Sequence, residues 1–199
     1  GASESFCTVE GNLFDHAWGD GEICSNKSSG NRFLHNLACH CPRSAFTLRG
    51  GNGVLFEGNV MVNNGDGIQV MGQRHTIISN LILDQQGSGV HFETGHLDGE
   101  SNVASVGSLV AHNTIVDCLA GAVSAMPPTP TRPHMPNRNA FVNNLFAGSS
   151  GILLDSRHMT HATILRNLYH ATGTAALGDL GQEPLVADPL LLGKDTHRA

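Results

Sequence analysis

The sequence predicts an all-β protein, a single-stranded right-handed parallel β-helix (solenoid) of about seven coils with loop insertions. Three observations lead to this prediction. Short apolar segments recur around an Asn, a second apolar series alternates with the first, and no stretch shows the spacing of an amphipathic helix. With 24 glycines and only 5% aromatic residues, the composition is typical of short strands joined by tight turns.

The recurring Asn marks one turn of the solenoid. Its steps along the chain are 24, 23, 21, 33, 31 and 23 residues, and a period of roughly 20–50 residues indicates a repeat architecture. Asn tolerates a left-handed backbone at a sharp turn, and its amide can hydrogen-bond to the Asn of the next coil. Leucine-rich repeats need several Leu per repeat at fixed offsets, and that pattern is missing. The asparagines are Asn12, Asn36, Asn59, Asn80, Asn113, Asn144 and Asn167.

The two long steps indicate insertions that leave the coil. One lies near residues 95–107 and is polar, and the other, residues 127–136, holds five of the eight prolines. Because Pro cannot donate to a strand ladder, the second insertion is predicted to be a loop. It is either a stiff surface excursion or a wall of a groove, in which Arg132, His134 and Arg138 would meet an anionic substrate.

One group of residues has the composition of a reaction centre. Lys27 and Arg49 are 22 residues apart, one repeat, so they are predicted to stack on adjacent coils roughly 5–8 Å apart. A neighbouring cation makes a lysine easier to deprotonate, and a neutral lysine can act as a general base. Asp20 and Glu22 would share a strand face and could hold Ca²⁺, which prefers oxygen ligands. A surface salt-bridge network of the same four residues is the alternative.

Further positions follow from the same register. Arg74 and His75 come after the strand that begins near Gly67 and could sit two coils above Lys27, unless they are surface turn residues. His91 and Glu93 would share a strand face and extend the groove.

The charge and hydropathy of the chain limit the kinds of partner that it is expected to bind. A formal net charge of −6 argues against a general nucleic-acid surface, although a groove can be basic locally. No apolar run approaches the roughly 20 residues of a membrane span. No signal peptide is visible, and a mature secreted protein would look the same.

The cysteines match no disulfide framework or zinc pattern. Their number is five, and only Cys39-His40-Cys41 forms a cluster. On a strand, the two cysteines of a C-x-C pair share a face but offer only two ligands, so free, largely buried thiols are expected.

The blocks GEICSNKSSGNRFLHN, FTLRGGN and GIQVMGQRHTIISN resemble polysaccharide lyase family 6, which contains alginate lyases and chondroitinase B-like enzymes. Weaker similarity continues through AHNTIVDC, NAFVNNLF and Asp188-Pro189-Leu190. The resemblance implies β-elimination of a uronic-acid polysaccharide, with alginate as the expected substrate. It implies that Lys27 is the base, that Arg49 is the acid or charge stabiliser, and that Asp20 and Glu22 bind Ca²⁺.

The sequence also departs from the family pattern. Asp20 replaces a Glu, Gly50 replaces a His, and Gln69 replaces an Arg that would contact a sugar carboxylate. Residues 1–199 are expected to form a single β-helix domain without the N-terminal coils usual in the family. A second copy of the chain is expected to cover the open N-terminal end. The resemblance further implies a secreted or periplasmic protein.

Three alternative functions stay open at this point. They are a chondroitinase B-like lyase acting on dermatan sulfate, a non-catalytic carbohydrate-binding β-helix, and a β-helix hydrolase with paired carboxylates. Alginate is preferred over dermatan sulfate because the chain lacks a dense set of Arg for sulfate groups.

Overall fold

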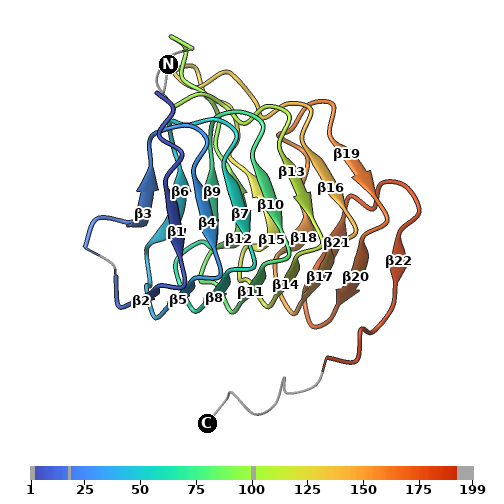
Figure 1. Cartoon of the computed structure of the whole chain (residues 1–199). Helices are drawn as coiled ribbons and strands as arrows, with labels where there is room; N and C mark the ends of the chain where they lie inside the picture. The colour runs from blue at the N-terminus through green and yellow to red at the C-terminus, as the bar shows by residue number, and fades with distance from the viewer. Residues whose placement is uncertain (1–2, 18, 100–101, 192–199) are drawn as a thin grey trace.

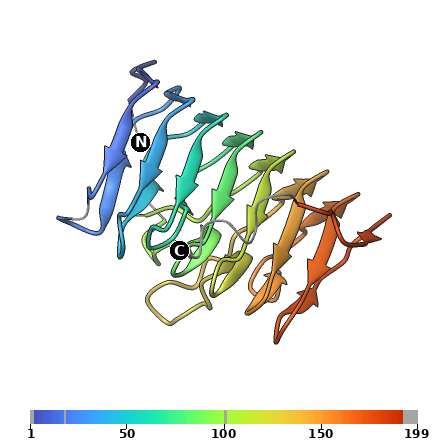
Figure 2. The same cartoon turned by 90° about the horizontal axis from the view of Figure 1, so that it is seen from below.

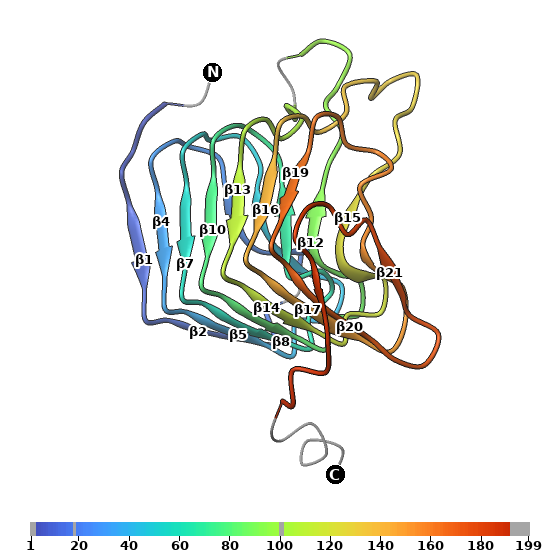
Figure 3. The same cartoon turned by 90° about the vertical axis from the view of Figure 1, so that its right-hand side faces the viewer.

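The computed structural model describes residues 3–17, 19–99 and 102–191. Within these residues every regular element is a short β-strand, and the strands form three parallel sheets of seven, eight and seven strands. Each of seven coils contributes one strand to each sheet, the second sheet has one additional strand at its C-terminal end, and successive coils are stacked in a single row (Figure 1). The stacking is seen from below in Figure 2 and from the C-terminal side in Figure 3. The predicted parallel β-helix of about seven coils is confirmed.

The sheets are named here by their order along each coil. The first sheet contains β1 (Thr8–Glu10), β4 (Arg32–Leu34), β7 (Leu55–Glu57), β10 (Thr76–Ile78), β13 (Leu109–Ala111), β16 (Ala140–Val142) and β19 (Thr163–Leu165). The second contains β2 (Leu13–Asp15), β5 (Leu37–Cys39), β8 (Val60–Val62), β11 (Leu81–Leu83), β14 (Thr114–Val116), β17 (Leu145–Gly148), β20 (Leu168–Ala171) and β22 (Leu185–Val186). The third contains β3 (Glu22–Asn26), β6 (Ala45–Leu48), β9 (Ile68–Val70), β12 (Ser88–Phe92), β15 (Gly121–Ala125), β18 (Ile152–Leu154) and β21 (Ala176–Gly178).

The core is a column of apolar side chains between the three sheets. Most strands have three residues, and in the first and second sheets the middle one points inward because side chains alternate across a strand. In the first coils several of the inward residues are aromatic. The Phe46 ring centroid lies 5.2 Å from that of Phe14, 5.8 Å from that of Phe33 and 5.3 Å from that of Phe56. Burial of such a side chain stabilises the fold by about 1.5–3 kcal/mol.

A ladder of buried asparagines runs along the corner between the first and second sheets. At one rung, the Asn59 backbone N–H and side-chain amide both donate to Asn80 Oδ1, at 2.9 and 3.1 Å. The predicted hydrogen bonding between coils is therefore confirmed. The expectation that Asn itself takes the left-handed turn is wrong. The residue before it does so, as at Gly58 (φ 66°) and Ser79 (φ 56°), which leaves the Asn side chain free to point inward.

The two insertions are loops, as the sequence predicts, and they contact each other. One joins β12 to β13 and the other joins β15 to β16, above the stack in Figure 1. The Gly95 N–H donates to His134 O at 2.7 Å. Arg132 Nη1 lies 2.7 Å from Glu93 Oε2 and ties the proline-rich loop to the end of β12.

The structure also tests what the sequence predicts for the cysteines. All five cysteines are free, and Cys41 and Cys118 are buried. Cys39 and Cys41 do not share a face, contrary to the strand-based expectation. His40 between them has a φ of 54°, which breaks the alternation.

No helix in the described part of the chain has the length and hydropathy of a membrane span.

Candidate functional site

On the third sheet, Lys27 and Arg49 directly follow the ends of the neighbouring strands β3 and β6. In the β3–β6 pair, Asn26 is in register with Leu48, so the residues that follow them are also neighbours. The Arg49 N–H donates to Asn26 O at 2.9 Å, which extends the ladder past β6. The stacking predicted from the spacing of 22 residues therefore exists in the backbone, because that spacing equals one turn of this coil.

Arg49 is held by two side chains from different parts of the chain. Its Nη1 lies 3.1 Å from Glu22 Oε1, and its Nε donates to Asn102 Oδ1 at 3.3 Å. The Arg49 side chain is 43% exposed and that of Glu22 is 18% exposed. A partly exposed pair of this kind stabilises the fold by about 1 kcal/mol or less. Its main consequence is that the guanidinium is oriented while part of it still faces solvent.

Lys27 is exposed and makes no ion pair with any residue that the structure describes. It is also the only lysine within the described ranges. Gly50, on the next coil, stands beside it, since a Cβ there would lie 3.5 Å from Lys27 O. The missing side chain at residue 50 therefore leaves the surface next to Lys27 open.

Three more of the predicted residues lie on the same sheet face. Gln69 is in register with His91, and both side chains are half-buried. His91 Nδ1 lies 2.8 Å from Ser124 Oγ, and its Nε2 lies 3.8 Å from Glu93 Oε1. Together with Lys27 and Arg49, these side chains form a polar strip across four coils, which we call the third-sheet strip.

Arg74 and His75 do not belong to this strip. Both follow β9, where Arg74 is exposed at a turn with a φ of 55°. His75 is 1% exposed, its Nδ1 accepts from the Val54 N–H at 3.2 Å, and its Nε2 lies 2.7 Å from Met71 O. The expectation that His75 contacts substrate is therefore not met, because its ring satisfies backbone groups inside the coil. Burial lowers the pKa of His75 to about 4.

Asp20 and Glu22 do not form a paired carboxylate face. β3 begins at Glu22, and Asp20 lies before it in a turn, separated by Gly21 with a φ of 70°. Ca²⁺ takes about six to eight oxygen ligands, whereas these two residues offer two carboxylates, one of them already paired with Arg49. This donor set does not fit a calcium site by itself, and calcium binding stays a prediction.

The sequence did not reveal the residues outside the repeating strands that hold side chains of the third-sheet strip in place. Asn102 reaches Arg49 from the first insertion, where no repeat register applies. Asp66 accepts from Gln69 Nε2 at 3.2 Å. A hollow of about 230 Å³ opens beside Gln69, and Arg43 and Ser44 also line it. The positions of Arg43 and Asp66 could have been found by extending the repeat register through the turns.

Comparisons with known proteins agree with this architecture. The sequence model of the family described as chondroitinase B matches residues 2–123. A search of curated proteins found no match. The structure of the PL6 family alginate lyase AlyGC is similar, with a TM-score of 0.76 and 26% identity, over 94% of this chain and 27% of that one.

Two further structures show the same fold. A PL6 alginate lyase in complex with a trisaccharide has a TM-score of 0.67 and 18% identity, over 87% of this chain and 44% of that one. The alginate lyase AlyF-OU02 in complex with G6 has a TM-score of 0.69 and 18% identity, over 94% of this chain and 46% of that one. The chain thus spans less than half the length of these relatives. Because the family model covers more than half of the sequence, the chain belongs to the chondroitinase B family, within polysaccharide lyase family 6.

Proposed function

We propose that this chain cleaves a uronic-acid polysaccharide, with alginate as the substrate, by β-elimination on the third-sheet strip. The observation that carries the proposal is the register of β3 and β6, in which an exposed lysine and an oriented arginine follow paired residues on adjacent coils. Coils about 4.8 Å apart would present the Lys27 amine and the Arg49 guanidinium within the width of one sugar residue.

The residue types fit the chemistry of the reaction. The neutral amine of Lys27 takes the proton from C5 of the uronate, the electron pair forms the C4–C5 double bond, and the C4–O bond to the leaving sugar breaks. The released oxygen then takes a proton from water. Because a proton next to a carboxylate is weakly acidic, the reaction needs positive charge where the carboxylate gains electron density.

Arg49 is suited to supply that positive charge. A guanidinium stays protonated at any working pH, so it serves better as an electrostatic stabiliser than as a proton donor. Glu22 and Asn102 hold it in one orientation. Such preorganised charge is effective because no reorientation is needed as the reaction proceeds.

The remaining members of the strip are proposed as substrate contacts. Gln69, His91 and Glu93 supply hydrogen-bonding groups to sugar hydroxyls further along the face. The choice of alginate is supported by the similar structures, which are those of alginate lyases. Dermatan sulfate is the second candidate, because the matching family model is described as chondroitinase B.

The test is a comparison of variants on three polymers: alginate, dermatan sulfate and polygalacturonate. Product is followed by the ultraviolet absorbance of the unsaturated uronate, and by reducing ends. Lys27→Ala should lower the rate about 10²–10⁴-fold, as expected for loss of a general base. Lys27→Arg should be equally slow although it keeps the charge. Arg49→Ala should lower the rate about 10²–10³-fold.

Arg166→Ala is the matched control, since Arg166 also pairs with a glutamate, at 2.6 Å from Glu183, but lies in the last coils. It should keep the wild-type rate. Reducing ends without the ultraviolet signal would support a hydrolase instead, and binding without turnover would support a carbohydrate-binding module. Full activity in Lys27→Arg would contradict the assignment of the base.

A further inference from the structure

A cluster of metal-binding side chains lies at the corner that follows the second sheet, on the first two coils. β2 and β5 end there in register, with Asp15 opposite Cys39. The next residues, His16 and His40, both take left-handed turns, with φ of 55° and 54°. Equivalent turn positions on coils about 4.8 Å apart project their side chains in the same direction. The histidines are therefore brought together by the repeat, 24 residues apart.

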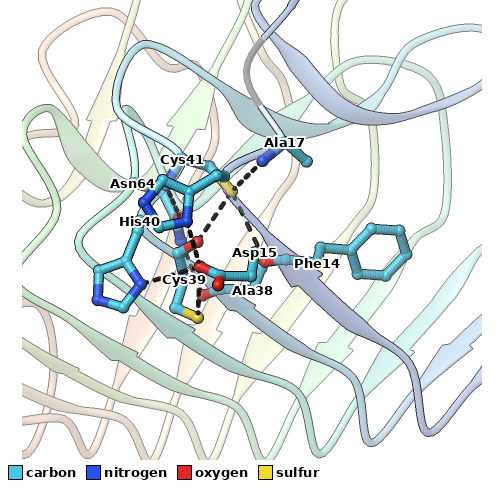
Figure 4. Close-up of polar contacts among 9 residues, drawn as sticks. Phe14, Asp15, Ala17, Ala38, Cys39, His40, Cys41 and Asn64 are labelled. Carbon is cyan, nitrogen blue, oxygen red and sulfur yellow. Dashed lines mark hydrogen bonds and ion pairs between the residues drawn. The ribbon is translucent and has the colours of Figure 1, made fainter.

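The side chains converge on one carboxylate oxygen. Asp15 Oδ1 lies 2.8 Å from His16 Nδ1 and 3.0 Å from His40 Nδ1. Cys39 Sγ is 3.6 Å from the same oxygen (Figure 4). Among the described residues, Asp15, His16 and His40 are the one group of three or more such side chains whose ligand atoms all lie within 4.8 Å of one another. All three are exposed, so an ion can reach them from solvent.

The donor types select a class of metal. Two imidazole nitrogens, a carboxylate oxygen and a thiol suit Zn²⁺ and its neighbours Co²⁺ and Ni²⁺, whereas Ca²⁺ and Mg²⁺ prefer oxygen alone. Bonds of about 2.0–2.3 Å place tetrahedral ligand atoms roughly 3.3–3.7 Å apart. The separations of 2.8 and 3.0 Å lie slightly below that range, and the ligand atoms of Asp15, His16 and His40 all lie within 4.8 Å of one another. Cys39 Sγ, 3.6 Å from Asp15 Oδ1, lies outside that group of three, so its side chain must rotate toward the histidines to become the fourth ligand.

Cys41 is not part of this cluster. It is fully buried, its Sγ accepts from the Ala17 N–H at 3.2 Å, and it lies 3.1 Å from Cys39 O. The turn at His40 sends the two cysteines in different directions, so the C-x-C motif contributes one thiol. The ligands come instead from two coils, which a C-x-C reading of the sequence does not reveal.

We propose that Asp15, His16, His40 and Cys39 bind one divalent transition-metal ion of the Zn²⁺ class. The ion displaces the thiol proton of Cys39 and links the first coil to the second. It would stabilise the N-terminal end of the solenoid, because anything that binds only the folded chain raises its stability. The site is separate from the third-sheet strip, so it does not depend on the proposed lyase activity.

The probe is Co²⁺ added to protein first stripped with a chelator. We expect one equivalent to bind, with visible d–d bands and a thiolate-to-cobalt charge-transfer band in the near ultraviolet. Cys39→Ser should retain the d–d bands and lose the charge-transfer band. The double variant His16→Asn and His40→Asn should bind about 100-fold more weakly or worse, and Zn²⁺ should no longer raise its melting temperature.

The matched control is the double variant His112→Asn and His161→Asn. These histidines are also exposed at left-handed turns, with φ of 55° and 52°. Asn tolerates that backbone, so all four replacements are equally mild. The control should bind Co²⁺ like the wild type.

Asp15→Asn, which keeps the shape of the side chain, provides a second variant if the double variant does not fold. It should also weaken binding. The proposal is overturned if the wild type binds no stoichiometric Co²⁺, if the His16/His40 variant or Asp15→Asn binds as tightly as the wild type, or if the control variant abolishes binding. A charge-transfer band that persists in Cys39→Ser would overturn the assignment of the thiol.

Discussion

Replacing one asparagine in the middle of the ladder should destabilise the whole solenoid. Asn113 is 1% exposed, and its Oδ1 accepts from the Asn80 N–H at 3.0 Å and from Asn80 Nδ2 at 2.9 Å. Its own amide donates to Ile77 O at 2.9 Å and to Asn144 Oδ1 at 3.0 Å. Asn113→Ala removes all of these contacts at once.

The magnitude follows from the donors that lose their acceptor. Asn80 is left with a buried backbone N–H and a buried amide N–H that no longer bond to residue 113. Each unsatisfied buried group costs about 1–3 kcal/mol, so the loss is about 2–6 kcal/mol. In a chain of this size, 1 kcal/mol shifts the melting temperature by about 2–4 °C. A fall on the order of 10 °C is expected.

Asn12→Ala provides the control, and calorimetry or urea unfolding followed by circular dichroism provides the measurement. Asn12 occupies the end of the same ladder but is exposed, and it donates to Asn36 Oδ1 at 3.1 Å. Water can replace its contacts, so the change should cost about 1 kcal/mol or less. If Asn113→Ala melts within about 2 °C of the Asn12→Ala variant, the ladder does not stabilise the fold as argued.

Four further outcomes are expected. Burial lowers the pKa of His75 from 6.5 to about 4. As the pH falls, this histidine is therefore protonated in the unfolded chain before it is protonated in the folded chain. The free energy of unfolding should therefore decline by about 3 kcal/mol between pH 6.5 and pH 4. The measurement is unfolding as a function of pH, and a His75→Gln variant whose free energy of unfolding falls with the same slope would contradict this assignment. Glu93→Gln should release Arg132 from its ion pair. Because such a pair contributes about 1 kcal/mol, the rate of amide hydrogen exchange in residues 127–136 should rise about five-fold. If calcium serves the reaction, EDTA should lower the rate on alginate and added Ca²⁺ should restore it, whereas a rate indifferent to both removes calcium from the reaction. If a second copy covers the first coil, sedimentation should detect a dimer, and a monomer at every concentration refutes it.

The β-helix architecture and the pairing of Lys27 with Arg49 could be predicted from the sequence because both depend on the period of the chain. A repeat buries one apolar residue per short strand, so the recurring Asn segments reveal the coil before any contact is known. Lys27 and Arg49 could be paired for the same reason, since residues one period apart stay in register. The prolines of residues 127–136 identified a loop because their missing amide protons exclude a central strand.

Only the tertiary structure decided what happens outside that register. Insertions fold back by contacts of their own, so nothing in the spacing could place Asn102 against Arg49 or Arg132 against Glu93. Turn residues do not follow the two-residue alternation of a strand. For this reason His75 lies inside the coil, and Cys39 and Cys41 point in different directions. The period of the sequence determines which residues are neighbours along the stack. The backbone angles at the corners decide which way each of those neighbours points.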